Sequence, residues 1–309
     1  MTPTCPVCAE TCFQLYRVVE SDLNEVPDGL DRLLSLEVRV ERCARCGLFR
    51  TIHLGDYRSS KELYEEDSLC FDASVSKVQL ASARSTSTTD ELLLLSTSPP
   101  AHLLDVGCGA GQFLQRASRA GYRGTGIDLD PQAVAFARDQ LGLDARHGSV
   151  GSLPEGEQFD IVTLFGVLEH IADPVEFLLK VCRRVSAGGE VLIGVPNAAS
   201  LNRWVSRLSA HDWDMFLEPG HLYHYKIGTL TRVAGRARLK LRRWSTGTMT
   251  IRGKVPLLPF RHAPLERRIQ KVVNKHPVVR RLYVSSLHLL DAFRLGDMLF
   301  ANFRVGTSD

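Results

Sequence analysis

Three glycines at alternate positions, Gly107, Gly109 and Gly111, follow an apolar run that ends near Asp105. The apolar run predicts a buried parallel strand, and residues 112–121 have the spacing of a helix. Glycine lets the backbone approach a ligand closely, and the N-terminus of a helix offers free N–H groups. The stretch therefore predicts a turn that binds a nucleotide or another anion.

The glycine spacing separates two classes of nucleotide site. A dinucleotide-binding turn has the pattern G-x-G-x-x-G, which would need a glycine at Gln112. The observed pattern, G-x-G-x-G, disfavours a nicotinamide dehydrogenase. A second predicted strand, 122–130, places Asp128 at its carboxyl end, where a carboxylate can accept hydrogen bonds from both ribose hydroxyls. The alternatives are a solvated Asp128, or Asp130 as the cap of a helix beginning at Pro131.

Four stretches follow one another in order: LLDVGCGAGQFL, YRGTGIDLD, FDIVTLFGVLEHIADP and SAGGEVLIGVPN. Together they resemble motifs of the class I S-adenosylmethionine-dependent methyltransferases, over about residues 103–248. The resemblance implies an α/β fold with a doubly wound, mostly parallel sheet of seven strands. Its last two strands, 238–246 and 298–305, would pair antiparallel at the sheet edge.

The same resemblance implies S-adenosyl-L-methionine as the cofactor. The residues it assigns to cofactor binding are Asp105, Gly107, Gly109, Gly111, Asp128, Leu129, Ser149 and Phe165. Ser149 stands where the family often has an acidic residue for the adenine amine. That departure weakens the assignment of the adenine contact.

Four residues are candidates for the base that activates a methyl acceptor. Glu169 and His170 follow the fourth predicted strand, and His221 and His224 lie in the run PGHLYHY. Histidine suits a general base near neutral pH, and in the enzymes that the chain resembles a histidine of the equivalent segment lies near the reacting methyl. The alternative is that these histidines are buried structural residues. Their spacing of three would put both rings on one face only if the segment were helical.

Two Cys-x-x-Cys pairs, Cys5 with Cys8 and Cys43 with Cys46, can supply four thiolates to a tetrahedral zinc ion. Four cysteines leave no open coordination position, so the zinc would be structural. The 34 residues between the pairs predict a hairpin or an irregular insertion at 20–36. The alternative is two unrelated reduced pairs. Cys12 is expected to be a spare thiol.

A zinc-binding module ahead of a methyltransferase core resembles the deoxysugar C-methyltransferases and related enzymes of small molecules. The resemblance implies that the module covers the acceptor pocket, with Tyr57 and Tyr64 at positions that can face the substrate. The predicted organisation comprises a zinc-binding module at 1–73, a helical connector at 74–100, and a methyltransferase domain at 101–309 with a basic helical insertion at about 249–296. The second helix of the insertion, 278–293, is expected to bury Leu282, Leu287, Leu290 and Phe293.

The charge is distributed unevenly, although the net charge is only +3. Residues 232–304 contain 17 Lys and Arg against three Asp and Glu. This basic segment indicates an anionic partner: an acidic acceptor, peripheral contact with a membrane surface, or nucleic acid. Nucleic acid is disfavoured because no aromatic–basic RNA-binding module is present. No apolar run nears the roughly 18–20 residues of a membrane span and no signal peptide is evident, so a cytoplasmic location is expected.

The sequence thus predicts methyl transfer from S-adenosylmethionine to an oxygen or carbon of a small-molecule acceptor, such as a sugar or a natural-product intermediate. One alternative is an RNA methyltransferase with a zinc module. Another is a non-catalytic protein that retains the cofactor fold, which the complete glycine pattern disfavours. The sequence leaves the acceptor and the oligomeric state open.

Overall fold

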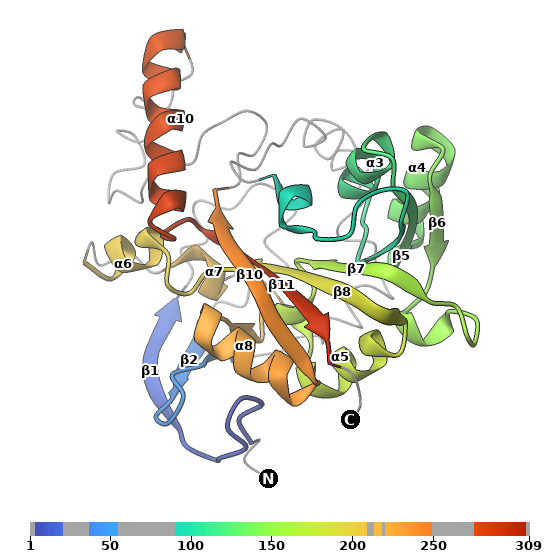
Figure 1. Cartoon of the computed structure of the whole chain (residues 1–309). Coiled ribbons are helices and arrows are strands. Elements are labelled where there is room, and N and C mark those ends of the chain that lie inside the picture. Colours follow the sequence, from blue (N-terminus) through green and yellow to red (C-terminus); the bar gives the residue numbers. More distant parts are fainter. Residues whose placement is uncertain are drawn as a thin grey trace.

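The computed structural model describes residues 4–20, 37–54, 90–208, 213–217, 220–248 and 275–306. Its main sheet has seven strands in the order β10-β11-β8-β7-β4-β5-β6 (Figure 1). The strands are β4 (His102–Val106), β5 (Arg123–Asp128), β6 (Asp144–His147), β7 (Phe159–Phe165), β8 (Val185–Pro196), β10 (Leu239–Gly247) and β11 (Met298–Val305). Strands β4 to β8 pair in parallel, whereas β11 pairs antiparallel with both β8 and β10. The predicted class I fold is confirmed.

Helices cover both faces of this sheet. Figure 1 shows α3 (Gln112–Arg119) and α4 (Pro131–Leu141) on one side, and α5 (Pro174–Cys182) and α8 (Ile227–Arg236) on the other. Short 3₁₀ helices, η2 (Glu91–Leu94), η3 (Val150–Ser152) and η4 (Leu168–His170), lie in the connections.

The start and end of α4 follow from three local residues. Pro131 occupies its first turn, and Gly142 ends it with φ +65°. The Asp130 carboxylate accepts hydrogen bonds from the N–H groups of Gln132 and Ala133. Asp130 is therefore the helix cap, so Asp128 at the end of β5 is not needed for that role.

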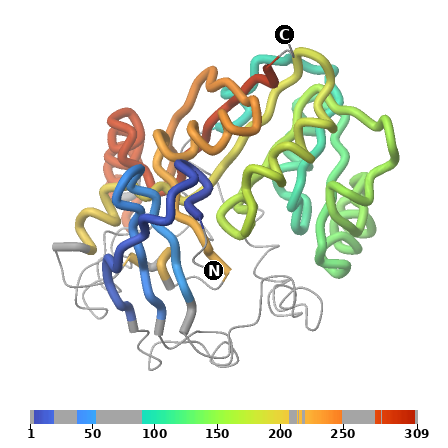
Figure 2. The backbone as a smooth tube through the Cα atoms, turned by 90° about the horizontal axis from the view of Figure 1, so that it is seen from below, coloured from blue at the N-terminus to red at the C-terminus, as the bar shows by residue number. Residues whose placement is uncertain are grey.

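A second sheet has four strands, β1 (Phe13–Glu20), β2 (Glu37–Cys43), β3 (Phe49–Leu54) and β9 (Tyr223–His224), in that order. β1 and β2 pair antiparallel and lie between the two cysteine pairs. The hairpin or irregular insertion predicted at 20–36 falls, after Glu20, outside the described residues. β9 comes from the PGHLYHY run and pairs with β3, so this sheet is not built from residues 1–73 alone. Arg236 of α8 also donates to the Pro6 carbonyl, at 2.7 Å. Figure 2 shows the blue N-terminal strands beside the orange segment that contains α8.

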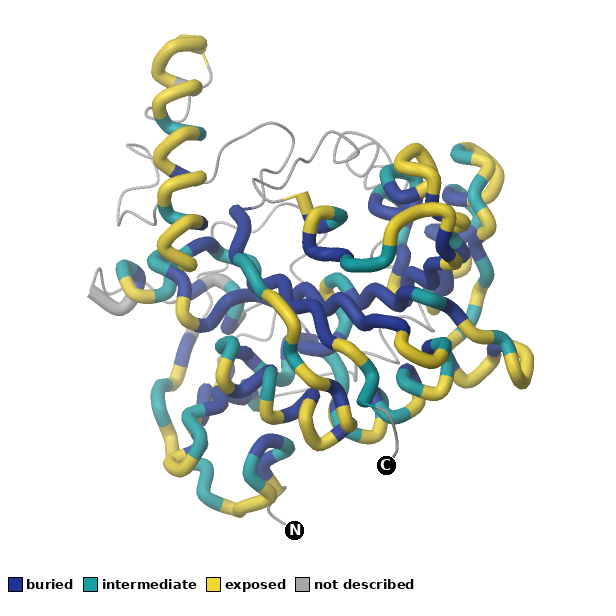
Figure 3. Tube along the Cα trace, in the orientation of Figure 1, coloured by how far each residue is buried: buried dark blue, intermediate teal, exposed yellow. Residues whose placement is uncertain are grey.

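Three further helices are α6 (Leu201–Leu208), α7 (Asp214–Leu217) and α10 (Pro277–Ala292). α10 rises from the body and is exposed along most of its length (Figure 3). Its burial differs from the prediction, because Leu287 is buried but Leu282 and Phe293 are 67% and 69% exposed. Apolar residues occupy two faces of this helix, and only one face contacts the body.

Several predictions concern residues outside the described ranges. They include Tyr57, Tyr64, most of the connector at 74–100 and the first part of the insertion at 249–296. The proposed domain boundaries therefore stay predictions. No helix in the described part of the chain is long and apolar enough to span a bilayer.

Candidate active site

The glycine turn after β4 brings the backbone to the end of β5. Gly107 has φ +73° and donates to the Ile127 carbonyl at 2.8 Å, and Gly111 has φ +82° directly before α3. A Cβ at Gly107 would lie 2.4 Å from Val167, and one at Gly111 would lie 2.6 Å from Leu143. These two glycines are therefore required by packing as well as by backbone conformation.

Gly109 differs from Gly107 and Gly111 in its surroundings. Its φ is +50°, and a Cβ built there would meet nothing within 4 Å. Gly109 thus faces open space beside the N-terminus of α3, where a ligand can approach the backbone.

Asp128 is fixed by the same turn. One carboxylate oxygen accepts from the Gly109 N–H at 2.7 Å, and the other accepts from the Asp130 N–H at 2.8 Å. Burial raises the pKa of Asp128, and the two backbone N–H groups oppose that rise. Because each carboxylate oxygen can accept a second hydrogen bond, Asp128 can also receive two ribose hydroxyls. The geometry fits the nucleoside part of the expected cofactor.

Asp105 lies behind the turn. It is 2% exposed, and its carboxyl oxygen accepts a 2.6 Å hydrogen bond from the Thr163 hydroxyl on β7. Burial raises the pKa of Asp105 to about 7. This arrangement ties β4 to β7 directly below the glycine turn.

The other predicted cofactor residues lie around this edge of the sheet. Leu129, which follows Asp128, is 46% exposed, and its carbonyl is 3.0 Å from His147 Nε2. Ser149 is exposed at the start of η3. Phe165 ends β7 and packs edge-on against Phe113 of α3, with ring centroids 4.6 Å apart.

Three of the four candidate bases lie together. The side-chain ligand atoms of Glu169, His170 and His221 all lie within 4.8 Å of one another. The His170 and His221 rings meet edge-on, with centroids 4.7 Å apart. The backbone fixes this arrangement, because the Leu222 N–H donates to the Glu169 carbonyl at 2.8 Å. We call these three residues the acid–histidine cluster.

Burial disfavours the charged forms of Glu169 and His170. Burial raises the pKa of Glu169 to about 8, and its Oε2 has no hydrogen-bond partner among the residues that the structure describes. Burial also lowers the pKa of His170. A protonated carboxyl group therefore lies beside a neutral imidazole, which is free to accept a proton.

His224 has different surroundings. It lies on β9 in extended backbone, so the helical arrangement considered for this segment does not occur. Its Nε2 is 2.6 Å from the Thr51 hydroxyl of β3, and the rings of Trp213 and Phe216 pack edge-on against it. The His221 ring lies 6.1 Å away, centroid to centroid. The structure thus separates the two predicted histidines: His221 joins the acid–histidine cluster, and His224 packs within the second sheet, where it joins β9 to β3.

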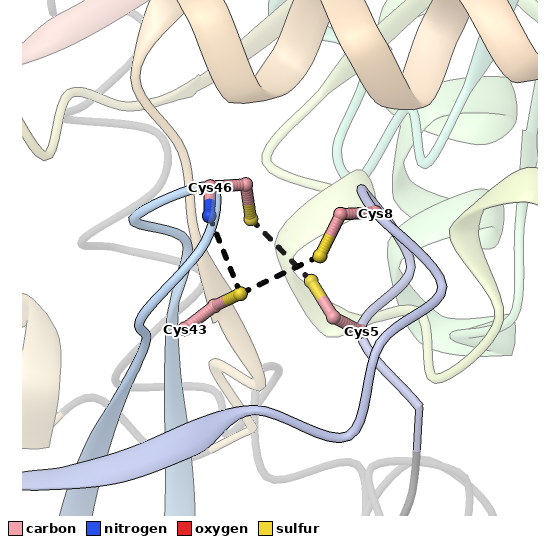
Figure 4. A group of neighbouring side chains, drawn as sticks. All are labelled: Cys5, Cys8, Cys43 and Cys46. Atoms are coloured by element: carbon pink, nitrogen blue, oxygen red, sulfur yellow. Dashed lines mark hydrogen bonds between the residues drawn. The ribbon is translucent and has the colours of Figure 1, made fainter.

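The four predicted cysteine ligands converge at the start of the N-terminal sheet (Figure 4). All four sulfurs lie within 4.8 Å of one another, with Cys5 and Cys46 3.5 Å apart and Cys8 and Cys43 3.6 Å apart. Four thiolates on zinc, with bonds of about 2.3 Å, lie about 3.8 Å from one another. The observed spacing is close to that of a zinc–thiolate tetrahedron.

The two cysteine turns share one backbone design. The residue after each second cysteine, Ala9 or Gly47, has a positive φ, of 59° and 77° respectively. Its N–H donates to the carbonyl of the first cysteine, at 2.8 and 2.9 Å. The N–H of Cys46 also points to the Cys43 sulfur, at 3.4 Å. Two turns of the same geometry present their sulfurs to a common centre, which two unrelated reduced pairs would not do.

Two residues near these sites, Thr51 and Thr163, were not identified from the sequence. Thr51 contacts His224 although 173 positions separate them, so no local signal exists. Thr163 is a polar residue within the apolar run of β7, and its register opposite Asp105 gives it a role. The sulfur of Cys12, the predicted spare thiol, lies 3.3 Å from that of Cys43.

The raised pKa of Glu169 predicts a pH dependence of stability. The folded protein holds this proton up to about pH 8, whereas the unfolded chain releases it near the ordinary value of 4.5. Folding is therefore opposed increasingly as pH rises between these values. Between pH 5 and pH 8, the unfolding free energy of the wild type should fall by about 2–4 kcal/mol more than that of Glu169→Gln. Urea unfolding at both pH values measures the difference, and parallel curves would show that Glu169 is ionised in the folded state.

The comparisons with known proteins agree with this geometry. The profile of a family described as "Methyltransferase domain" matches residues 80–242, which is more than half of the chain. Among solved structures, the protein resembles a chain from the complex between the Haloferax volcanii Trm112 methyltransferase activator and a methyltransferase. The TM-score is 0.52 at 17% identity, over 78% of this chain and 95% of that one. At this identity the likeness concerns the fold alone.

Two curated proteins are similar in sequence over a shorter region. The chain is 31% identical over 139 residues to a protein of Roseobacter denitrificans, and 33% identical over 139 residues to one of Ruegeria pomeroyi. Both are named ubiquinone biosynthesis O-methyltransferase. Each match covers 39% of this chain and 56% of the relative. The chain therefore spans only about half the length of the curated relatives it matches.

Proposed function

Since the chain belongs to the methyltransferase domain family, we propose that it transfers a methyl group from S-adenosyl-L-methionine to an oxygen atom of a small-molecule acceptor. The observation that carries this proposal is the joint arrangement of Gly109 and Asp128. Gly109 faces open space, and its N–H fixes a carboxylate at the end of the neighbouring strand. This combination suits a nucleoside ligand, and the G-x-G-x-G spacing disfavours a dinucleotide.

The cofactor, when bound, supplies a methyl group on a positively charged sulfur. The chain's own residues hold its other parts. Asp128 would accept the ribose hydroxyls, and the turn from Gly107 to Gly111 would lie along the ligand. Ser149 and Leu129 lie farther along the same edge of the sheet and are proposed to contact the adenine.

The acid–histidine cluster is proposed to hold and deprotonate the acceptor. Glu169 and His170 lie in η4, the short helix that follows β7. The hydrogen bond from the Leu222 N–H to the Glu169 carbonyl holds the neighbouring His221 beside them. The neutral imidazole of His170 can take the proton of an acceptor hydroxyl, while the protonated Glu169 can donate a hydrogen bond. His221 lies in the same cluster and is the second candidate for this base. The remaining task is orientation, because displacement of a methyl group needs the attacking oxygen within about 3–3.5 Å of it.

The relatives favour oxygen over carbon as the atom methylated. Both are named as O-methyltransferases of ubiquinone biosynthesis, which supports a small organic acceptor with a hydroxyl group. Methylation of a sugar or of a carbon atom, which the resemblance to deoxysugar C-methyltransferases implied, stays a prediction. Screening phenols, catechols and nucleotide sugars with methyl-labelled cofactor separates these acceptor classes.

We also propose that Cys5, Cys8, Cys43 and Cys46 bind one structural zinc ion. The sulfur spacing and the two matching turns support this assignment. The zinc site lies where β2 turns into β3, and β3 holds β9 and His224. The zinc module, comprising residues 1–73 together with β9, would therefore fix one wall of the acceptor site.

The ribose assignment predicts a large effect of Asp128→Ala. Loss of charge-assisted hydrogen bonds costs about 1.5–3 kcal/mol, which corresponds to a roughly ten- to hundredfold weaker affinity for S-adenosylmethionine. Isothermal titration calorimetry measures the change. Asp139→Ala is the matched control, because Asp139 is an exposed carboxylate of α4 that pairs with its neighbour Arg138. Equal affinities of the two variants would remove Asp128 from the cofactor site.

A further inference from the structure

α10 presents an unusual surface. Val278, Leu282, Leu289 and Phe293 are 72%, 67%, 59% and 69% exposed. They are spaced by four, seven and four residues, which places all four on one face of a helix. We call this face the apolar stripe. It extends over about 22 Å, given a rise of about 1.5 Å per residue.

The apolar stripe is not needed for packing. The opposite face of α10 makes the contact with the body, where Leu287 is buried and Tyr283, Val284 and Leu290 pack around it. Asp291 lies near this inner face and is 8% exposed. Figures 1 and 3 show that the helix rises from the body with its outer surface exposed. The described part of the chain leaves these four large apolar side chains exposed in one row, which marks a candidate interaction surface.

The charges around the apolar stripe have one sign. Lys275 and Arg281 are exposed beside it, and His288 is also exposed. Asp291 is the one acidic residue between positions 275 and 296, and it is buried. The whole segment 232–304 holds 17 Lys and Arg against three Asp and Glu. The partner is therefore expected to be both apolar and anionic.

We propose that α10 docks on the surface of an anionic lipid membrane. A helix with an apolar row and cationic flanks lies in the interface, with the row among the acyl chains and the cations at the headgroups. A second copy of the chain fits less well, because paired stripes would bring Arg281 and His288 of both copies together without a carboxylate to balance them. Nucleic acid would leave the apolar stripe in water. This proposal does not depend on the methyl-transfer reaction.

Vesicle binding tests the proposal with the full-length chain. The wild type should cosediment with phosphatidylcholine vesicles that contain about 30 mol% phosphatidylserine. It should bind pure phosphatidylcholine more weakly, and lose affinity between about 0.1 and 0.5 M salt. The triple variant Leu282→Gln, Leu289→Gln and Phe293→Gln should bind at least about tenfold more weakly. Arg281→Glu should weaken binding about five- to tenfold, and only on the anionic vesicles.

A matched control removes exposed apolar side chains elsewhere. Leu15 and Leu93 are 61% and 73% exposed, so the double variant Leu15→Gln, Leu93→Gln should bind vesicles like the wild type. Far-UV circular dichroism checks that all variants are folded. Three results would overturn the proposal: no preference of the wild type for anionic vesicles, wild-type binding by the triple variant, or a dimer in sedimentation that the triple variant dissociates. The last result would identify a second copy as the partner.

Discussion

Cys43→Ser is expected to abolish zinc binding and to unfold the N-terminal sheet. A structural zinc contributes about 10–16 kcal/mol in small zinc-binding peptides, so its loss exceeds what this small sheet can compensate. Cys43 is the ligand whose sulfur accepts the Cys46 N–H, and it ends β2. Metal analysis should find about one zinc per wild-type chain and none in the variant. Hydrogen exchange should show lost protection in β2 and β3.

Cys12→Ser is the matched control for the zinc site. The Cys12 sulfur also lies close to that of Cys43, at 3.3 Å, but Cys12 belongs to neither of the two matching turns. The variant should therefore retain zinc and the folded sheet. A folded wild-type protein without zinc would contradict the zinc assignment. Loss of zinc in Cys12→Ser would show that Cys12 is a ligand in place of one of the four proposed cysteines.

His221→Ala is expected to lower turnover about 10²–10⁴-fold while the affinity for S-adenosylmethionine stays unchanged. This range is the usual contribution of a general base. His221 is the candidate of the PGHLYHY run that lies with Glu169 and His170. The pH–rate profile should also lose the limb that reports protonation of the base. Turnover is measured with whichever acceptor the labelled-methyl screen identifies.

His224→Ala separates a catalytic from a structural histidine. Its ring packs against Trp213 and Phe216 and contacts Thr51, so the variant should mainly lose stability. At a temperature where it is folded, its turnover should exceed that of His221→Ala. If both variants turn over like the wild type, the base is His170 or a group outside the acid–histidine cluster.

Local sequence signals predicted much of the main sheet and its turns. The glycine pattern, the cap at Asp130 and the proline at the start of α4 depend on neighbours within a few residues, so the sequence alone specifies them. The turn at Cys43 likewise follows from a local signal, because Gly47 readily adopts the positive φ that it needs. The turn at Cys5 has no such signal, because Ala9 takes the same conformation.

Contacts between distant segments could not be predicted. The pairing of β9 with β3 joins positions about 170 residues apart, and a two-residue strand has no periodicity to detect. The acid–histidine cluster likewise requires His221 to return to the end of β7.

The prediction that Leu282 and Phe293 of α10 are buried was wrong for a related reason. Its apolar residues occur on two faces, and periodicity alone does not show which face meets the body. The packing of Leu287 against its neighbours decides which face is buried.

Calorimetric titration of the wild-type chain with S-adenosylmethionine, S-adenosylhomocysteine and NAD tests the central claim most directly. The account predicts saturable binding of the first two at one site per chain and no binding of NAD, because the open space beside Gly109 and the fixed carboxylate of Asp128 suit a single nucleoside. No saturable binding of either adenosyl compound, or binding of NAD in their place, would contradict it.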